Sequence, residues 1–517
     1  MVTQSGATVT VAISDPLTEL ATVDKYGVQA ILDATELTNA TYTGTGAQEW
    51  TFVGPAASFG DDIVVDGTAV AAEITLGAQT YEFTATTKTG STDTSLVLEN
   101  VVFISNDPGA ADVGPTAFAA GSVYGIRVSA FKAMRLTDRN GPSLEVGELT
   151  SNEVSANRQE TSIRSGFQQV TGQIGFELSY LSQDELIELA TADPFADLTA
   201  AAGNAGNGSA TYTASTKTFG ALTAQNANDV GQYFLCYFDT SFSFIGLLET
   251  TTSVKVVQHL QGEEPEGNLS AGSVTSLDVV GMEISMVRKA PMRYSTIVKD
   301  YPEISAAQAF GGCTVNNLSM SVQPGSLATG TADILGIEAK RMQGQGETAG
   351  RFNYGEDGDF RNDVEGNVGS LANTTAYSPF SSCVAIDNVG TGVVSGFDFT
   401  INNNRETIPL LCSAFADNVY EGVANVSGTM TLLFEDEGEY NKFANETESS
   451  VIITLSGGAA DGSDAMFFHF PRVRYTQPSF EVPANGPVVL TLNFRSLEAD
   501  YGQANDPVKT SCVIGRA

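Results

Sequence analysis

Two segments of the chain alternate apolar and polar residues in the way that a half-buried β-strand requires. The first is Val170–Leu178, and the second begins 256 residues later as Val426–Phe434. Such alternation places every second side chain on one face of a sheet. A helical pattern follows each strand: Ser182–Ala190 opens with the S-x-x-E signature of a capping box, and Glu437–Phe443 is a shorter candidate helix. Each segment therefore predicts a strand followed by a helix.

The same order of further elements surrounds both strands. Upstream of each there is an Asn-Arg pair: Asn157-Arg158 and Asn404-Arg405. Downstream of each there is a hairpin pattern, in Leu318–Ile334 and Ser479–Phe494. The offset between the hairpins is 482 − 322 = 160, so the first copy is longer by 256 − 160 = 96 positions, many of them within 195–275. This repeated order predicts an internal duplication.

The first 118 residues differ from the rest, because they carry 15 acidic residues and only two basic ones. Short β patterns such as Glu49–Val53 and Leu96–Phe103 recur there between turn residues, which is typical of a small sandwich or partial barrel. Residues 106–122 read as a linker. We therefore expect an N-terminal β-rich accessory domain over 1–118, interpreted as a surface decoration, a first domain over 119–345 and a second over 346–517.

Composition supports a β-rich globular chain and excludes several classes of function. Hydrophobic residues make up 42% of the 517 residues, charged residues only 17%, and the formal charge is −36. With two histidines, His259 and His469, neither a Ser-His-Asp triad nor a usual catalytic zinc site is easily assembled. His469 lies in an aromatic strand pattern and is expected in a core. The five cysteines are scattered and are expected to be buried free thiols.

No targeting or membrane segment is expected either. Residues Met1–Gly6 lack the pattern of a signal peptide, and no window approaches 18 uninterrupted apolar residues. The strong negative charge argues against a protein that wraps DNA or binds an anionic membrane, since phosphate affinity comes from Lys and Arg.

Several segments, in this order, resemble the tail tube proteins of long-tailed (siphovirus-like) bacteriophages. They span about 125 to 500 and are Ser151–Arg158, Gln169–Tyr180, Val315–Gly325, Asn425–Asp436, Tyr440–Phe443 and Phe470–Thr476. The resemblance implies a mainly β fold with two tandem tail-tube-type β-sandwich or barrel domains, each with a flanking helix. It implies a structural virion protein with no enzymatic activity, cofactor or metal.

The resemblance also implies partners and a location. Copies of the chain are expected to form homotrimeric, pseudo-hexameric rings that stack into a tube, a conduit for DNA delivery to the host. The other expected partners are the tape measure protein, the tail terminator, the baseplate or tip proteins, and viral DNA passing through the lumen without sequence-specific binding. No membrane partner is expected. The protein is expected in the virion tail after synthesis in the host cytoplasm.

Two polar loops are candidates for contacts with a neighbouring ring, and the alternative is that they are solvated hairpin loops. They are Glu160–Gln169 and Thr407–Glu421. The candidate self-assembly residues are Asn157, Arg158, Arg164, Asn404 and Arg405. The arginines are candidates for ion pairs between subunits or, equally, ordinary surface residues. The acidity itself predicts a net negative lumen, because an acidic wall repels DNA and lets it slide.

Two other hypotheses of function stay open. The first is a surface-exposed adhesin or S-layer-like β-sandwich protein that binds calcium or host-cell glycans. Its support is the acidic stretch Tyr354–Asp359 with Asp363 and Glu365, although the twelfth position counted from Asp357 is Val368 rather than the Glu of an EF-hand. The second is a carboxylate-pair hydrolase, which rests only on the abundance of acidic residues.

Overall fold

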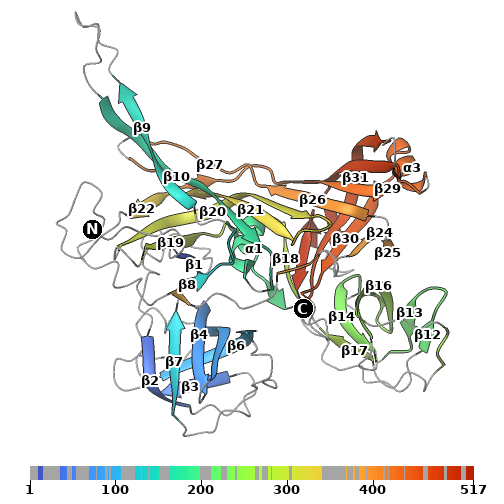
Figure 1. Cartoon of the computed structure of the whole chain (residues 1–517), viewed down its shortest axis with the longest axis horizontal. Helices are drawn as coiled ribbons and strands as arrows, with labels where there is room; N and C mark the ends of the chain where they lie inside the picture. Colours follow the sequence, from blue (N-terminus) through green and yellow to red (C-terminus); the bar gives the residue numbers. More distant parts are fainter. Residues whose placement is uncertain are drawn as a thin grey trace, which may run out of the picture.

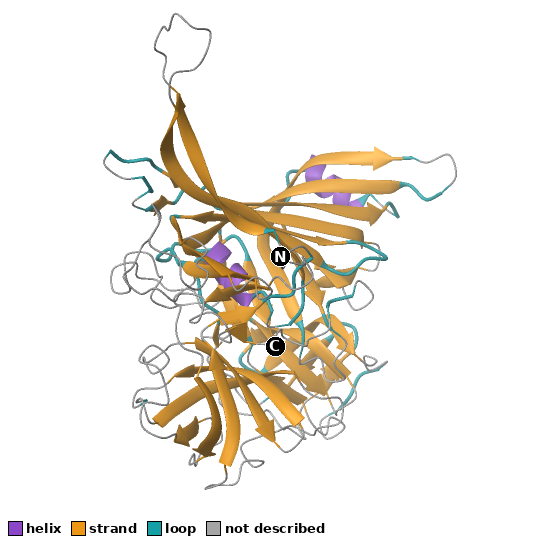
Figure 2. Ribbon diagram, turned by 60° about the vertical axis from the view of Figure 1, so that its left-hand side comes forward, coloured by secondary structure: helices purple, strands orange, loops and turns teal. Residues whose placement is uncertain are grey.

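The computed structural model shows a protein of β-strands with two short helices in its described part (Figure 2). The described residues are 10–14, 35–42, 49–53, 69–76, 79–87, 91, 95–105, 123–129, 131–137, 140–150, 163–180, 182–197, 211–222, 230–238, 242–261, 267–270, 277–280, 282–301, 306–340, 368–369, 376–378, 383–391, 394–411, 414–416, 418–435, 437–457, 464–482, 486–501 and 508–516. The predicted fold class, mainly β, is confirmed.

One antiparallel sheet, called the main sheet below, runs through both halves of the chain. Its strands pair in the order β9, β10, β21, β20, β26, β29, β32, β31. Their bounds are β9 Gly141–Thr150, β10 Ile163–Glu177, β21 Thr329–Gly336, β20 Ala306–Val322, β26 Val394–Asn402, β29 Asn425–Leu433, β32 Val489–Ser496 and β31 Met466–Glu481. The pair β20–β26 joins the strands of the first half to those of the second.

The strand register supports the duplication that the sequence offsets predict. Gly172 faces Ile334 across β10–β21, and Gly428 faces Phe494 across β29–β32. These pairs differ by the predicted offsets, because 172 + 256 = 428 and 334 + 160 = 494. Both halves also have the same strand order, β9-β10-β21-β20 and β26-β29-β32-β31. Two units with little sequence identity therefore share one topology.

The irregularities of the two halves coincide as well. The ladder β20–β21 has a bulge between Val315 and Asn317, and β31–β32 has one between Tyr475 and Gln477, at the same offset, since 315 + 160 = 475. A second pair of bulges, in β19–β20 and β30–β31, matches in the same way. A bulge re-aims the residues of a strand and interrupts the ladder locally. Its recurrence at equivalent positions is difficult to obtain from unrelated strands.

A second layer packs on one face of the main sheet and completes a sandwich. It contains β1 Thr10–Ser14, β8 Phe131–Ala133, β18 Glu283–Met286, β19 Ser295–Tyr301, β22 Glu338–Lys340, β24 Cys383–Ile386, β30 Ser449–Leu455 and β35 Val513–Arg516. Strands β20 and β31 take part in both layers, since their first halves pair with β19 and β30 and their second halves with β21 and β32. One apolar core lies between the layers and includes Phe176, Phe399 and Phe494.

One helix follows the second main-sheet strand of each half. Helix α1 (Asp184–Thr191) buries Leu186, Ile187 and Leu189 in the shared core, whereas α3 (Gly438–Ala444) only rests two aromatic side chains against it. The expected flanking helices are thus present. Among the helices in the described part of the chain, none is both long and apolar enough to cross a membrane.

The predicted capping box at α1 is wrong. The Oγ atom of Ser182 accepts a hydrogen bond from the backbone N–H of Arg135, so it is not available to cap the helix. The cap residue is Gln183, whose side chain instead accepts from the N–H of Ser179 and donates to the carbonyl of Glu177. A contact with a segment 47 residues away has replaced the local cap that the sequence pattern indicated.

The N-terminal region forms a closed barrel, with strands in the order β2-β3-β6-β5-β4-β7 (Figure 1). The strands are β2 Thr35–Tyr42, β3 Glu49–Val53, β4 Ala69–Leu76, β5 Gln79–Thr87, β6 Ser95–Ser105 and β7 Val123–Ser129. The expected linker, 106–122, connects two strands of this barrel, which therefore extends past residue 118 to Ser129. Strand β1, in contrast, pairs with β19 and β8 and belongs to the sandwich.

Much of the long insertion forms a separate six-stranded sheet with the order β12-β13-β16-β15-β14-β17. Its strands are β12 Thr211–Thr213, β13 Thr218–Gly220, β14 Tyr233–Phe238, β15 Phe242–Thr250, β16 Ser253–Gln261 and β17 Leu277–Val280. In Figure 1 this insertion sheet and the barrel both lie below the main sheet. The remaining strands are β11 Ala196–Asp197, β23 Val368–Gly369, β25 Val389–Thr391, β27 Glu406–Thr407, β28 Val419–Tyr420, β33 Ala499–Tyr501 and β34 Val508–Thr510.

Candidate functional site

The second face of the main sheet is mostly polar, and we call it the polar face; Leu335, Leu433 and Val489 are apolar residues on it. Strand alternation sends the apolar residues of each strand into the sandwich core and their neighbours to this opposite face. None of the polar side chains on this face is fully buried; they are Ser143, Glu145, Gln169, Thr171, Gln173, Glu177, Asn317, Ser319, Ser321, Thr329, Thr331, Asp333, Asp398, Thr400, Asn402, Asn425, Ser427, Thr429, Thr431, Arg474, Gln477, Ser479, Glu481, Thr491, Asn493 and Arg495.

Hydrogen bonds between neighbouring strands hold the side chains of this face in place. In the first half, Asp333 accepts from the amide of Gln173 at 3.0 Å and from that of Asn317 at 3.1 Å. In the second half, the hydroxyl of Thr429 donates to Asn493 at 2.9 Å. Thr429 and Asn493 are the duplicated counterparts of Gln173 and Asp333, since 173 + 256 = 429 and 333 + 160 = 493. Both halves thus present an ordered polar surface at the same place.

The polar face is weakly acidic. Among its residues are five carboxylates, those of Glu145, Glu177, Asp333, Asp398 and Glu481, and two guanidinium groups, those of Arg474 and Arg495, which gives a formal charge of 2 − 5 = −3. The rest are hydroxyls and amides. Without clusters of Lys and Arg, such a surface has no strong affinity for phosphate groups. It is suited to line a polar passage rather than to bind a nucleic acid tightly.

The structure places the predicted self-assembly residues in different surroundings. Asn157 and Arg158 lie outside the described residues. Arg164 is exposed near the start of β10, and Asn404 is exposed with a positive φ of 48° just after β26. Of the loop predicted over 160–169, the part from Ile163 onward is strand β10 rather than loop.

Arg405 is buried inside the subunit, with 1% of its side chain exposed. Its Nη1 donates to the carbonyls of Leu189 and Val315 and to the hydroxyl of Thr314, at 2.6–2.7 Å. Its Nη2 reaches Glu421 at 3.4 Å. Burial lowers the pKa of the guanidinium, and Glu421 opposes that shift. Arg405 thus ties the loop after β26 to α1 and β20 within one chain, so its contacts are not those of an exposed ion-pairing residue.

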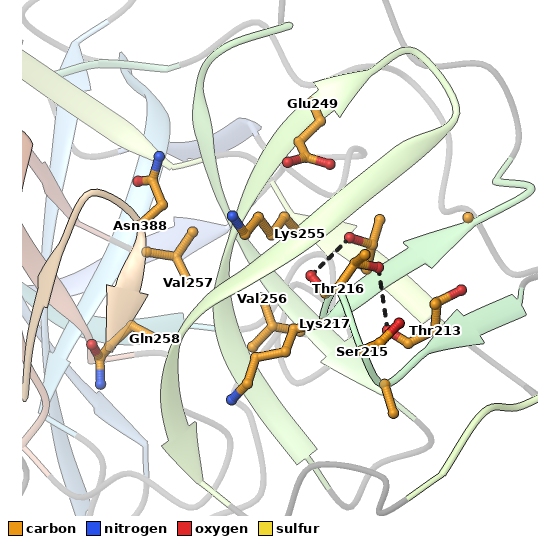
Figure 3. Close-up of a pocket in the computed structure, with 13 residues that line it drawn as sticks. Thr213, Ser215, Thr216, Lys217, Glu249, Lys255, Val256, Val257, Gln258 and Asn388 are labelled. Atoms are coloured by element: carbon orange, nitrogen blue, oxygen red, sulfur yellow. Dashed lines mark hydrogen bonds between the residues drawn. The ribbon is translucent and has the colours of Figure 1, made fainter. Parts of the chain in front are cut away.

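A cavity of about 890 Å³ lies between the insertion sheet and the β24–β25 turn (Figure 3). Its lining is rich in hydroxyl groups, and Figure 3 marks the hydrogen bonds that the hydroxyls of Thr216 and Thr218 donate to nearby carbonyls. Glu249 is the single carboxylate among its described lining residues. The described lining therefore lacks the pair of carboxylates that glycoside hydrolysis usually requires.

Other predicted chemistry has little support in the described residues. No group of three or more His, Cys, Asp or Glu side chains in the described part of the chain is arranged to hold a metal ion. The acidic stretch Tyr354–Asp359 lies outside that part. Three cysteines are buried and unpaired as expected: Cys236, Cys313 and Cys512. Cys383 is exposed, which corrects the expectation, and Cys412 is outside the described residues.

His469 lies in the core, as predicted, where the insertion sheet packs on the second half of the sandwich. Its Nε2 is 3.3 Å from the hydroxyl of Tyr233, and the ring contacts Tyr501. The Nδ1 atom is buried with no hydrogen-bond partner among the described residues. Burial lowers the pKa of His469 from 6.5 to about 3, because no nearby group compensates the charged imidazolium.

We expect His469 to make the docked insertion sheet sensitive to acid. The unfolded chain takes up a proton below about pH 6.5, but the folded chain does so only near pH 3, so stability falls as the pH decreases between these values. The slope approaches about 1.4 kcal/mol per pH unit, and the loss at pH 4.5 is about 2–3 kcal/mol. Urea denaturation at pH 7 and pH 4.5 measures it. His469→Phe removes the group that takes up the proton, so the free energy of unfolding of this variant should lose this part of its pH dependence. An unchanged pH dependence would contradict the assignment of the effect to His469.

Comparison with known proteins gives one family. The family model described as phage tail tube protein matches residues 111–496, which covers both halves of the main sheet. No curated protein matches the chain.

Proposed function

This chain belongs to the phage tail tube protein family, and we propose that its copies assemble in threes into pseudo-hexameric rings that stack into the tube. Its role in the virion is structural. The observation that carries the proposal is the duplicated main sheet, with equivalent strands, bulges and polar side chains in both halves. A chain with two equivalent units gives six units from three copies, and head-to-tail contacts of this kind close into a ring.

The main sheet has a size that suits the wall of such a ring. Three copies would supply 3 × 8 = 24 strands from the order β9-β10-β21-β20-β26-β29-β32-β31. With strands about 4.8 Å apart and tilted, 24 strands give a cylinder on the order of 40–50 Å across. We propose that the polar face lines this lumen, since the second layer, the barrel and the insertion sheet all lie on the other side of the sheet (Figure 1).

A polar, weakly acidic lining supports passage of viral DNA without sequence-specific binding. The polar face has a formal charge of 2 − 5 = −3 per chain and a dense set of hydroxyl and amide groups. These groups hydrate the wall, while the carboxylates repel phosphates over a range of about a Debye length, ~8 Å at physiological salt. No catalytic step is proposed. Delivery of the DNA to the host then depends on low friction along the wall.

The connections between the first and second main-sheet strands of each half are proposed to contact the neighbouring ring. The β9–β10 arm exposes Leu149 and Ile163, and the β26–β29 connection exposes Leu411 and Val423, the last two at 96% and 77%. Exposed apolar side chains on projecting arms are typical of an interaction surface. Arg164 stands on the first arm and Asn404 begins the second connection. Six such arms would leave each ring.

Further partners follow from the same proposal. The tape measure protein would occupy the lumen before DNA does, and the tail terminator and the baseplate or tip proteins would meet the two ends of the stack. The protein is then synthesised in the host cytoplasm and functions in the virion tail.

Negative-stain electron microscopy of the purified full-length protein tests the proposal. The expected result is hollow rings with threefold symmetry, or tubes built from them, as the protein is concentrated. Alanine at both Leu411 and Val423 should remove contacts between rings but leave single rings intact. Particles of one copy at every concentration, also in the presence of tail tips that initiate assembly, would contradict the proposed ring.

A further inference from the structure

The two ends of the main sheet carry strand edges that have no partner in the described part of the chain. Strand β9 pairs with β10, and the segment Gln477–Glu481 of β31 pairs with β32. Figure 1 shows β9 and the α3 end of β31 on opposite sides of the molecule. An open edge is a template for pairing with another chain. Two open edges on opposite sides allow head-to-tail closure.

The duplication identifies the counterpart of each open edge inside the chain. Strand β31 corresponds to β20, because the bulge at Val315 recurs at Tyr475 and 475 − 315 = 160. Strand β9 corresponds to β26, because Pro142 faces Gly172 as Phe399 faces Gly428, and 399 − 142 = 257. Since β20 and β26 pair with each other within the chain, the equivalent pair between chains is β31 with β9.

We propose that β31 of one copy pairs antiparallel with β9 of the next copy, in the register that sets Ser479 opposite Ser143. In the internal junction Ser319 faces Thr400. The offsets carry this pair to 319 + 160 = 479 and 400 − 257 = 143. The proposal rests on the proposed ring and specifies its seam at the level of single residues.

Side-chain exposure supports a second copy as the occupant of these edges. Phe480 is 44% exposed, whereas its counterpart Met320, in the internal junction, is 4% exposed. Likewise Leu144 is only partly buried, whereas its counterpart Ile401 is fully buried. A neighbouring β9 would cover Phe480 in the same way that β26 covers Met320. The edge thus lacks the cover that an identical unit provides elsewhere in the fold.

The seam between copies is a weaker version of the internal junction. In that junction, the N–H of Asn403 donates to the carbonyl of Asn316 at 2.8 Å. Hydrogen-bonded pairs alternate along an antiparallel ladder, so Leu318 and Ile401, two residues further, form a hydrogen-bonded pair as well. All residues of these internal pairs have a backbone N–H group that can donate a hydrogen bond.

Proline removes two of these donors at the seam between copies. The hydrogen-bonded pairs there would be Pro478 with Leu144 and Phe480 with Pro142, by the same offsets. Proline has no backbone N–H, and on an edge strand it hinders pairing with another chain. The seam therefore forms with fewer bonds than the junction it copies, which keeps single chains apart until they are concentrated or aligned by an initiating complex.

Cysteine cross-linking tests the register. Opposed residues that are not hydrogen-bonded lie about 4.5 Å apart at Cα, within the range of a disulfide, and Ser479 and Ser143 form such a pair in the proposed seam. In a background with Cys383→Ser, we expect Ser143→Cys with Ser479→Cys to give covalent dimers and trimers on oxidation. Ser143→Cys with Gln477→Cys, two residues out of register, is the matched control. Ser319→Cys with Thr400→Cys should link within one chain.

The outcomes separate the seam from the ring itself. Rings seen by electron microscopy that lack the 143–479 cross-link, or that form the 143–477 link equally well, would overturn the seam and leave the ring standing. Absence of rings under every condition would count against both.

In a second measurement, Pro142→Val with Pro478→Val should lower the critical concentration for assembly about tenfold or more, since two hydrogen bonds are restored. Pro324→Val, in the β20–β21 turn, should leave it unchanged; an unchanged value in the double variant would refute the role of the prolines.

Discussion

Replacing Arg405 with alanine is expected to lower the free energy of unfolding of the sandwich by about 3–4 kcal/mol. Hydrogen bonds from a charged donor contribute about 1.5–3 kcal/mol each, and buried acceptors left without a donor add their desolvation cost. The guanidinium donates hydrogen bonds to the carbonyls of Leu189 and Val315 and to the hydroxyl of Thr314, all buried within the subunit. The substitution therefore removes several charged bonds at once and opens a space beside α1.

The sole tryptophan provides an internal reference for this measurement. Trp50 lies on β3 of the N-terminal barrel, whereas Arg405 bonds to α1 and β20 of the sandwich. In urea, the far-ultraviolet circular dichroism midpoint of the sandwich should decrease, whereas the Trp50 fluorescence midpoint should not change. Arg405→Lys should lower the free energy of unfolding about half as much, since one ammonium group replaces only part of the hydrogen bonds of the guanidinium. Arg495→Ala, at an exposed guanidinium bonded to Asn425, should cost less than about 0.5 kcal/mol. Equal effects at both sites would contradict the buried role of Arg405.

The alternating segments were informative because their period of two is a local property that the tertiary structure kept. Val170–Leu178 and Val426–Phe434 lie in β10 and β29 except for their last residues. The two offsets, 426 − 170 = 256 for these strands and 494 − 334 = 160 for the hairpins, reappear as strand register. Register is strongly specified where one face of a strand is buried, because a slip of one residue would exchange the two faces. The duplicated topology was therefore predictable without sequence identity between the copies.

Contacts between distant segments were not predictable in the same way. The sequence placed Arg405 among candidate surface arginines, but its burial depends on α1 and β20, whose contacting residues are 89 or more positions away. Strand β1 reads like the other N-terminal strands, yet its partners are β19 and β8. The turn-rich stretch 106–122 resembles a linker, although the strands on both sides of it close one barrel. Local composition carries no information about which strand a segment will pair with.

The polar face was foreseen only as a charge expectation for a lumen. Its members alternate with the core residues that the pattern identified, so their common orientation could have been read from the same periodicity. What the sequence did not indicate is that Gln173, Asp333 and Asn317 hydrogen-bond across three strands, with counterparts in the second half. That arrangement requires the sheet order, which only the structure supplies.

Lysine at two equivalent positions of the polar face is expected to convert the tube into one that retains DNA. Thr171 and Ser427 correspond to each other, since 171 + 256 = 427, and neither is fully buried. Thr171→Lys with Ser427→Lys would place 3 × 2 = 6 ammonium groups around the lumen of each proposed trimeric ring. Where 6–10 phosphates are neutralised, affinity for DNA falls about 10³–10⁵-fold between 50 and 200 mM salt, which is the dependence expected here. Co-sedimentation of duplex DNA with assembled tubes should therefore be strong for the variant at about 50 mM salt, lost at high salt, and absent for the unchanged tube.

Thr252→Lys with Thr447→Lys adds the same charge at exposed positions away from the main sheet and should not retain DNA in this way. Retention by that control alone, or equal retention by both variants, would show that the polar face does not line the passage.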